Sequence, residues 1–267
     1  MATVHTSLGK RIGSEGSYSR GGMFTLKERH ALKQGNEWYP DTPIVLSGLQ
    51  LRLDAANPLS YPGTGSTWFD LSGNGFNAEI INSPTWVDQQ AGYFNVNAAS
   101  VHTFKVSKPN PGITGQITTE SWVYFDNFES SPTLIHKGGH YTLQILASGT
   151  AYYWADSSTY SYATFGSRNY NFGPTGTWKQ IVVTKDTSHN VRLYVNGALV
   201  DTRVGFGSAL SHRDTSLWLI GYADGEINPP PSNLMNGRFS VAHVYNRQLS
   251  DAEVLQNFNA IRGRYGI

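Results

Sequence analysis

The chain has 267 residues, of which 13% are aromatic, only 15% are charged and none is cysteine, and its net charge is +1. Soluble domains average about a quarter charged residues, and helical arrays are rich in Glu, Lys, Leu and Ala, so this composition excludes a coiled coil and favours a β-rich domain. It also excludes disulfides and thiolate metal sites, a nucleic-acid partner that needs a basic face, and insertion of a membrane helix of about 20 apolar residues.

Residues 1–41 differ from the rest and are predicted to form an extended arm with one short helix. Residues 1–22 are polar and rich in Gly and Ser, so no secretion signal is expected. Thr25 and Glu28 form a capping-box pattern, and Gly35 predicts the end of that helix. The segment is either a solvated leader or an arm that orders on a larger assembly. The residues expected to anchor it are Arg11, Arg20, Phe24, Leu26 and Trp38.

From residue 42 onward, a two-residue hydrophobic period predicts short β-strands. Leu49, Leu51 and Leu53 alternate with polar residues, and similar runs surround Trp122 and Ile181. In the last strand, four side chains are expected on a single face: Phe239, Val241, His243 and Tyr245. Segments rich in Gly, Pro and Asn separate the runs. The pattern predicts one all-β domain over residues 42–267, an antiparallel sandwich or barrel.

The segment VRLYVNGALVDTR predicts a β-hairpin. Its first strand directs Val191, Leu193 and Val195 inward, and Asn196-Gly197 is the dipeptide most typical of a two-residue type I′ turn. The return strand is expected to run to Arg203.

Only the last segment of the chain has a helical pattern. Ser250 and Glu253 form a capping box, and Val254 and Phe258 lie on one apolar stripe four residues apart. The pattern ends near Gly263. We expect this short C-terminal helix to cover an edge or end of the sandwich.

Six segments follow one another through residues 45–267: GLQLRLDAANPLSYPGTGSTWFDLSGNGFNAEI, SWVYF, GTWKQIVVTKD, LYVNGALV, LWLIG and NGRFSVAHVYNRQLSDAEVLQNFNAIRGRYGI. Together they resemble a laminin-G-like domain of the concanavalin A-like lectin/glucanase superfamily. The resemblance implies an antiparallel jelly-roll sandwich of two sheets with one concave face.

Two further features are similar to segments of bacteriophage virion proteins: the RYG that follows the C-terminal helix, and the leader GGMFTLKERHALKQGNEWYPD. This resemblance implies a non-enzymatic structural protein on the exterior of the virion, a capsid decoration or tail appendage held by capsid or tail protein. The alternative that the superfamily implies is a carbohydrate-binding adhesin for host-surface glycans. Self-association into a homo-oligomer stays open.

No catalytic residues are expected. Related family 16 glycoside hydrolases carry an E-x-D-x-E strand, and the sequence has no such triplet. The nearest pair, Asp224 and Glu226, lies in a proline-rich segment without a third carboxylate, whereas a glycosidase needs two rigidly held carboxyl groups. His136 and His140 are four residues apart in a glycine-containing segment, and two histidines alone do not make a zinc site.

The segment Asp70–Gly75 (DLSGNG) matches the first half of a calcium loop. Its carboxylate, hydroxyl and amide alternate, but the twelfth position is Ile81 instead of Glu, so the segment is not an EF-hand. The alternative is a turn whose polar side chains cap their own backbone. Laminin-G-like relatives bind a structural Ca²⁺ with such loops. We therefore expect no required cofactor and consider a structural Ca²⁺ held by Asp70 and Asn74.

The densest aromatic stretch is AYYWADSSTYSYATFGSRNYNFG. It is predicted to be a glycan or partner surface, because alternation exposes roughly half of its side chains. The alternative is core packing with hydrogen-bonded tyrosines. The predicted surface residues are Tyr152, Tyr153, Trp154, Tyr160, Tyr162 and Tyr170. Four tryptophans in strand-like apolar contexts are expected in the core: Trp68, Trp122, Trp178 and Trp218.

Overall fold

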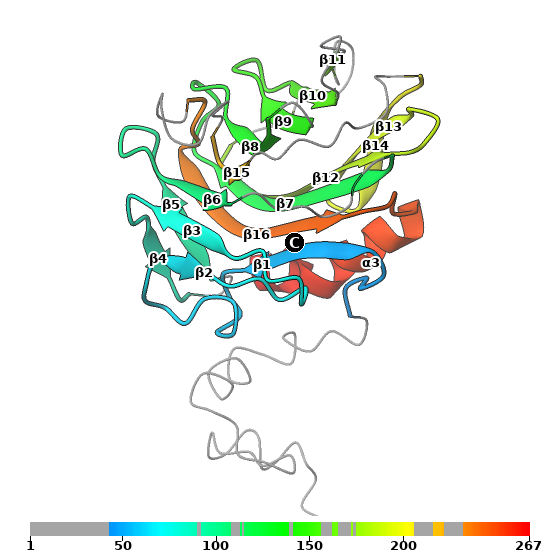
Figure 1. Ribbon diagram of the computed structural model, residues 1–267. Helices are drawn as coiled ribbons and strands as arrows, with labels where there is room; N and C mark the ends of the chain where they lie inside the picture. Colours follow the sequence, from blue (N-terminus) through cyan, green and yellow to red (C-terminus); the bar gives the residue numbers. More distant parts are fainter. Residues whose placement is uncertain are drawn as a thin grey trace, which may run out of the picture.

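A computed structural model describes residues 43–89, 92–107, 113, 115–138, 141–155, 162–164, 172, 175–205, 216–221 and 232–267. These residues form a sandwich of two antiparallel β-sheets with one short C-terminal helix (Figure 1). The predicted all-β antiparallel sandwich is thereby confirmed. The predicted anchoring arm and its helix lie outside the described residues.

One sheet, here called the front sheet, has the strand order β14-β13-β12-β7-β16-β5-β4, and β1 pairs with the same edge of β16 as β5 does. The strands of the front sheet are β1 (Leu49–Asp54), β4 (Thr85–Val87), β5 (Tyr93–Val96), β7 (Ile117–Phe125), β12 (Trp178–Lys185), β13 (Val191–Val195), β14 (Ala198–Arg203) and β16 (Gly237–Tyr245).

The other sheet, the back sheet, has the order β11-β10-β9-β8-β15-β6-β3-β2. Its strands are β2 (Thr67–Trp68), β3 (Ala78–Ile81), β6 (Thr103–Val106), β8 (Thr133–Lys137), β9 (Tyr141–Ile145), β10 (Ala151–Ala155), β11 (Tyr162–Thr164) and β15 (Leu217–Leu219).

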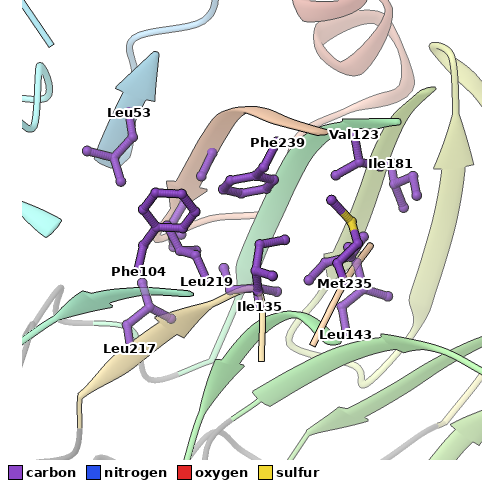
Figure 2. Packing of buried hydrophobic residues seen from close by; sticks show 14 of the residues in the cluster. Leu53, Phe104, Val123, Ile135, Leu143, Ile181, Leu217, Leu219, Met235 and Phe239 are labelled. Atoms are coloured by element: carbon purple, nitrogen blue, oxygen red, sulfur yellow. The ribbon is translucent and has the colours of Figure 1, made fainter. Parts of the chain in front are cut away.

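The hydrophobic core lies between the two sheets. Figure 2 shows side chains of the front sheet, such as Val123 and Phe239, meeting those of the back sheet, such as Phe104 and Ile135. Each of these four side chains is fully buried. Trp68 packs edge-on against Phe104 and Phe239 at centroid distances of 5.1 and 5.8 Å. The inward alternation predicted for β1 is confirmed for Leu51 and Leu53, which belong to this cluster. It is wrong for Leu49, which packs on the opposite face of the front sheet, because the register of β1 shifts between Leu49 and Leu51.

Strand β16 differs from its prediction. A β-bulge shifts its register against β7 between Phe239 and Val241. Phe239 therefore packs in the core between the sheets, whereas Val241 and Tyr245 pack on the opposite, outer face of the front sheet. The expectation that Phe239, Val241, His243 and Tyr245 share one face is wrong, because one extra residue in a strand reverses the direction of every later side chain.

The predicted hairpin is confirmed. β13 pairs with β14, and the two turn residues Asn196 and Gly197 have φ values of 51° and 76°, as a type I′ turn requires. A Cβ atom added at Gly197 would lie 3.0 Å from Leu255 and Phe258. The turn is therefore packed directly against the C-terminal helix.

That helix, α3 (Asp251–Ile261), begins with the predicted capping box of Ser250 and Glu253. It packs on the outer face of the front sheet, where Val254 and Ile261 contact Trp122 and Tyr245. The expectation that it covers an edge or end is wrong, because Trp122 on β7 and Val241 and Tyr245 on β16 form an apolar cluster on the outer face that the helix covers. A short 3₁₀ helix, η2 (Arg262–Tyr265), follows. Within the described ranges no helix is long and apolar enough to cross a membrane.

Candidate functional site

The helix-covered half of the front sheet contains a buried polar network around Glu120, whose side chain is fully buried. One carboxylate oxygen accepts hydrogen bonds from the indole of Trp122 (3.0 Å) and the amide of Gln180 (2.8 Å). The other accepts from the amide of Asn257 on α3 (2.8 Å) and lies 3.1 Å from Nδ1 of His243. The network therefore joins three strands to the helix.

Burial by itself would raise the pKa of Glu120, but the adjacent His243 and the hydrogen bonds it receives lower it below the ordinary value. Asn257 extends the network, since its amide also donates to the hydroxyl of Tyr245 (2.9 Å) and its oxygen accepts from the backbone of Val45 (2.8 Å). The carboxylate thus has four partners and no access to solvent. This arrangement positions α3 and residues 43–45 and offers nothing to a ligand.

A buried ion pair fixes the end of the chain beside this network. Arg264 donates to both carboxylate oxygens of Asp54 at 2.8 and 2.9 Å. Burial would raise the pKa of Asp54, but the positive charge of Arg264 lowers it. The pair holds η2 against β1 and places the next residue, Tyr265, over the rings of Trp122 and Trp178 at 4.4 and 4.5 Å.

Beyond Tyr265 the same strands present a second, different surface, here called the open aromatic face, which consists of Tyr93, Tyr124, Trp178 and Arg238. Strand pairing places Arg238 opposite Tyr124, and Tyr124 opposite Trp178, so three adjacent strands contribute one residue each. Tyr93 comes from β5, on the other side of β16. All four side chains are half-buried, so they are accessible to a ligand.

The side chains of the open aromatic face contact one another closely. The guanidinium carbon of Arg238 lies 4.1 Å from the centroid of Tyr124 and 5.3 Å from that of Tyr93. Trp178 meets Tyr93 and Tyr124 in edge-to-face contacts at 5.6 and 5.9 Å. Such contacts restrict rotamers before any ligand binds, which lowers the entropic cost of binding.

The hydrogen-bonding groups of this face are unused within the structure. In the described part of the chain, neither hydroxyl of the two tyrosines, nor the indole N–H of Trp178, nor the guanidinium of Arg238 has a hydrogen-bond partner. In the covered half, by contrast, Glu120 has four partners. Aromatic surface combined with unused donors is the composition of a recognition surface.

Trp178 is the main residue of this candidate site that the sequence did not reveal. Trp68, Trp122 and Trp218 are buried as predicted, with at most 1% exposure, but Trp178 is half-buried on the outer face. The prediction for Trp178 is wrong because it begins β12, at the end of the sheet that α3 does not reach. Its neighbours Gly176 and Thr177 are exposed. The absence of apolar residues just before Trp178 was the feature of the sequence that could have indicated an accessible position.

The predicted aromatic surface at residues 152–172 is only partly described. Tyr152 is half-buried, but Tyr153 is 1% exposed and belongs to the core between the sheets. The prediction is wrong for Tyr153, because it is paired with Leu143 on the inward-facing side of β10. For Trp154 and Tyr162 only the strand positions are described, and Tyr160 and Tyr170 lie outside the described residues.

The outer face of the back sheet carries a row of partners that crosses several strands. Lys105 is opposite Trp218, Trp218 opposite His136, His136 opposite Thr142, and Thr142 opposite Trp154. His136 Nδ1 lies 2.6 Å from the Thr142 hydroxyl, and Lys105 lies 5.5 Å from the Trp218 ring. His136 and Trp218 are at most 1% exposed, so the middle of this row is not accessible to a ligand.

The predicted calcium loop is locally saturated with hydrogen bonds. One oxygen of Asp70 accepts from the backbone N–H groups of Arg52 and Ser72, both at 2.9 Å. The other accepts from the Ser72 hydroxyl (2.7 Å) and the N–H of Phe76 (3.0 Å). Asn74 donates to the Gln50 carbonyl at 3.0 Å. These bonds favour a self-capped turn that covers the free edge of β1; a structural Ca²⁺ stays a prediction.

Asp224, Glu226 and His140, for which neither a catalytic nor a zinc site is expected, lie outside the described residues. Among the residues whose placement is described, no group of three or more His, Asp or Glu side chains is arranged to hold a metal ion.

Comparisons with known proteins agree with this architecture. The sequence model of the family described as concanavalin A-like lectin/glucanases superfamily matches residues 97–255, more than half of the chain. No curated protein matches the sequence significantly.

Among solved structures, the binding domain of Paraclostridial Mosquitocidal Protein 1 superposes with a TM-score of 0.61 at 15% identity, covering 80% of this chain and 52% of that one. The binding domain of botulinum neurotoxin DC in complex with SialylT gives a TM-score of 0.59 at 13% identity, covering 81% and 52%. A structure of botulinum neurotoxin type C gives a TM-score of 0.59 at 15% identity, covering 80% of this chain and 51% of that one. The chain thus spans about half of these structures, and the likeness shows the fold.

Proposed function

We propose that this chain, which belongs to the concanavalin A-like lectin/glucanase superfamily, is a non-enzymatic glycan-binding module. The observation that carries the proposal is the open aromatic face. Sugars present apolar ring faces edged by hydroxyl groups, and they are recognised by aromatic side chains accompanied by a few fixed polar groups. This face offers three aromatic rings together with unused hydroxyl, indole and guanidinium donors.

The similar structures support this class of ligand. One is a complex with SialylT, and another concerns a toxin whose cell entry depends upon interaction with two ganglioside molecules. Each match covers about half of those chains, so the support concerns the class of ligand and not the position of its site.

A binding role also fits the placement of the acidic groups. Glu120 and His243 form an acid–base pair in which both side chains are at most 1% exposed. A glycosidase needs two carboxyl groups that reach the scissile bond. Glu120 cannot reach a substrate, which favours binding over hydrolysis.

The test is binding of the full-length chain to a glycan array, followed by titration of the best glycan. Trp178→Ala should weaken binding about tenfold or more, as expected for a central aromatic contact. Tyr152→Ala is the matched control, since Tyr152 is a half-buried aromatic residue on the other sheet. If Tyr152→Ala abolishes binding and Trp178→Ala does not, the site lies on the back sheet. If no glycan binds, the function is wrong.

A role on a phage virion remains our proposal for where the module acts. It is supported by the similarity of the leader and the C-terminal RYG to virion proteins, and it gives residues 1–41 an anchoring role on capsid or tail protein. Particles assembled with a chain that lacks residues 1–35 should contain none of it, whereas the full chain is incorporated. Normal incorporation of the shortened chain would contradict the anchor.

A further inference from the structure

We infer that the open aromatic face selects glycans that carry a carboxylate, and that Arg238 binds this group. The inference rests on the proposed glycan-binding function. It adds that the ligand is negatively charged and names the residue that binds the charged group. Its basis is the combination of one guanidinium without a counter-ion and three aromatic rings on a single accessible surface.

The geometry of Arg238 suits a planar anion. Its guanidinium lies 4.1 Å from the centroid of Tyr124. In this cation–π contact the ring engages the guanidinium group and holds it in position, but takes up none of its five N–H donors. Two parallel N–H groups of a guanidinium match the two oxygens of a carboxylate. The stacking therefore prepares the group for a bidentate contact before the ligand arrives.

The electrostatic surroundings leave that contact open. Several other described arginines are paired with carboxylates, since Arg264 contacts Asp54, Arg247 contacts Glu253 and Arg203 contacts Asp201. Arg52, like Arg238, has no such pair among the described residues. For Arg238, no described carboxylate lies within the 4.0 Å limit of an ion pair. A half-buried guanidinium without an anion is the strongest local attraction that this face offers to a negatively charged ligand.

The neighbouring groups are suited to the rest of an acidic sugar. Asn95, which is exposed, is the strand partner of Arg238 on the side away from Tyr124. Its amide can donate to and accept from sugar hydroxyl groups. Tyr93, on the same strand as Asn95, and Trp178, on β12 beyond Tyr124, supply apolar surface and two further donors. A carboxylate at Arg238 would thus place its sugar ring beside amide and aromatic side chains.

The position of Arg238 is rigidly determined by the backbone. The preceding residue, Gly237, has a φ of 147°, and a Cβ atom there would lie 2.0 Å from the carbonyl oxygen of Tyr124. Only glycine allows β16 to approach β7 this closely. The approach explains why the guanidinium reaches the face of the Tyr124 ring instead of extending into solvent.

The experiment compares matched pairs of probes on the full-length chain. Polygalacturonate is compared with fully methyl-esterified polygalacturonate, and sialyllactose with lactose, because each pair differs only in the carboxylate or the acidic sugar. Dextran sulfate against dextran tests whether sulfate replaces carboxylate. Binding of at least one carboxylate form should exceed that of its neutral partner about tenfold or more and should weaken as salt increases.

Two variants then test the residue. Arg238→Gln should lower carboxylate binding about tenfold to hundredfold, and Arg238→Lys should lower it less, because it keeps the charge but loses the planar fork. Because Arg238 is part of the face, binding of the neutral partners is not an unchanged baseline, so the measured quantity is the ratio of acidic to neutral binding, which should fall about tenfold or more for Arg238→Gln. Melting temperatures verify that both variants are folded.

The outcomes separate the two proposals. If no probe and no arrayed glycan binds, both the function and the inference fail. If neutral forms bind as well as acidic ones, or if Arg238→Gln binds carboxylates normally, the function stands and the inference is overturned. If only dextran sulfate binds, carboxylate selectivity is overturned as well.

Discussion

The outer face of the front sheet has two halves that use the same strands differently. Trp122 and Tyr124 are two positions apart on β7, and Gln180 and Trp178 are two positions apart on β12. Trp122 and Gln180 lie beneath α3, where they donate hydrogen bonds to Glu120 and have no exposure. Tyr124 and Trp178 lie past the reach of the helix, half-buried and with unused polar atoms.

This difference between the two halves indicates which part of the sheet can bind a ligand. Buried polar groups need partners, since an unsatisfied one costs about 1–3 kcal/mol. The covered half is consequently closed by Glu120, His243, Gln180 and Asn257, which satisfy one another. The open half has no such requirement because water can satisfy its groups until a ligand replaces it. We expect substitutions in the covered half to affect stability and those in the open half to affect binding.

The largest effect is expected for Glu120→Ala. It removes the acceptor of four buried groups and leaves His243 and Gln180 without their partner, so the free energy of unfolding should fall by about 3–5 kcal/mol. Urea denaturation measures the loss. Glu120→Gln keeps one acceptor oxygen, so it should lower the free energy of unfolding by less. A loss below about 1 kcal/mol for Glu120→Ala would show that the network does not hold the covered half together.

The next effect is expected at the ion pair that fixes the chain end. Asp54→Ala leaves Arg264 buried without a counter-charge and should lower the free energy of unfolding by about 3 kcal/mol. The double variant Asp54→Leu with Arg264→Met should recover much of this loss, because no charge then remains buried. A double variant as unstable as Asp54→Ala would contradict the assignment of the loss to the uncompensated charge.

A smaller effect concerns acid stability. Hydrogen bonds from Arg247 lower the pKa of Glu253 from 4.5 to about 2. Because the folded pKa lies below the unfolded one, the stabilisation is complete above about pH 5 and is lost as the pH falls toward 2. Glu253→Gln should lower stability by about 1–2 kcal/mol at pH 7 and flatten the pH dependence between 5 and 2. Urea denaturation at pH 7, 4 and 2.5 measures this dependence. If the free energy of unfolding of Glu253→Gln varies with pH as that of the unmodified chain does, Arg247 does not lower the pKa of Glu253.

The smallest effect on stability is expected in the open half. Trp178→Ala removes a half-buried ring and should cost about 1–2 kcal/mol, less than either substitution in the covered half, although we expect it to weaken glycan binding about tenfold or more. Leu255→Ala, at a position on α3 that is 46% exposed and packs against the hairpin turn, should lower stability by less than about 1 kcal/mol and leave glycan binding unchanged. A Trp178→Ala variant that unfolds would show that the ring is part of the core.

Local patterns in the sequence were sufficient for several elements. Asn196-Gly197 specified its turn because glycine and asparagine tolerate positive φ, and Ser250 with Glu253 specified the start of α3 because both groups pair within one turn. Leu51 and Leu53 of β1 showed the two-residue period of a half-buried strand, although Leu49 lies on the opposite face. Each of these features depends on residues that are close together in the chain.

Tertiary structure alone decided which residues meet on the open aromatic face. Tyr93, Tyr124, Trp178 and Arg238 come from four strands, and their contact depends on strand order and on where α3 ends, which no local pattern contains. The two-residue period shows that side chains alternate, but it does not show which face is the core when both faces are apolar. The bulge after Phe239 added a second ambiguity, because it reversed the faces within one strand. The low charge and high aromatic content of the sequence thus predicted a β-sandwich, and the fold determined which of its aromatic residues remain accessible.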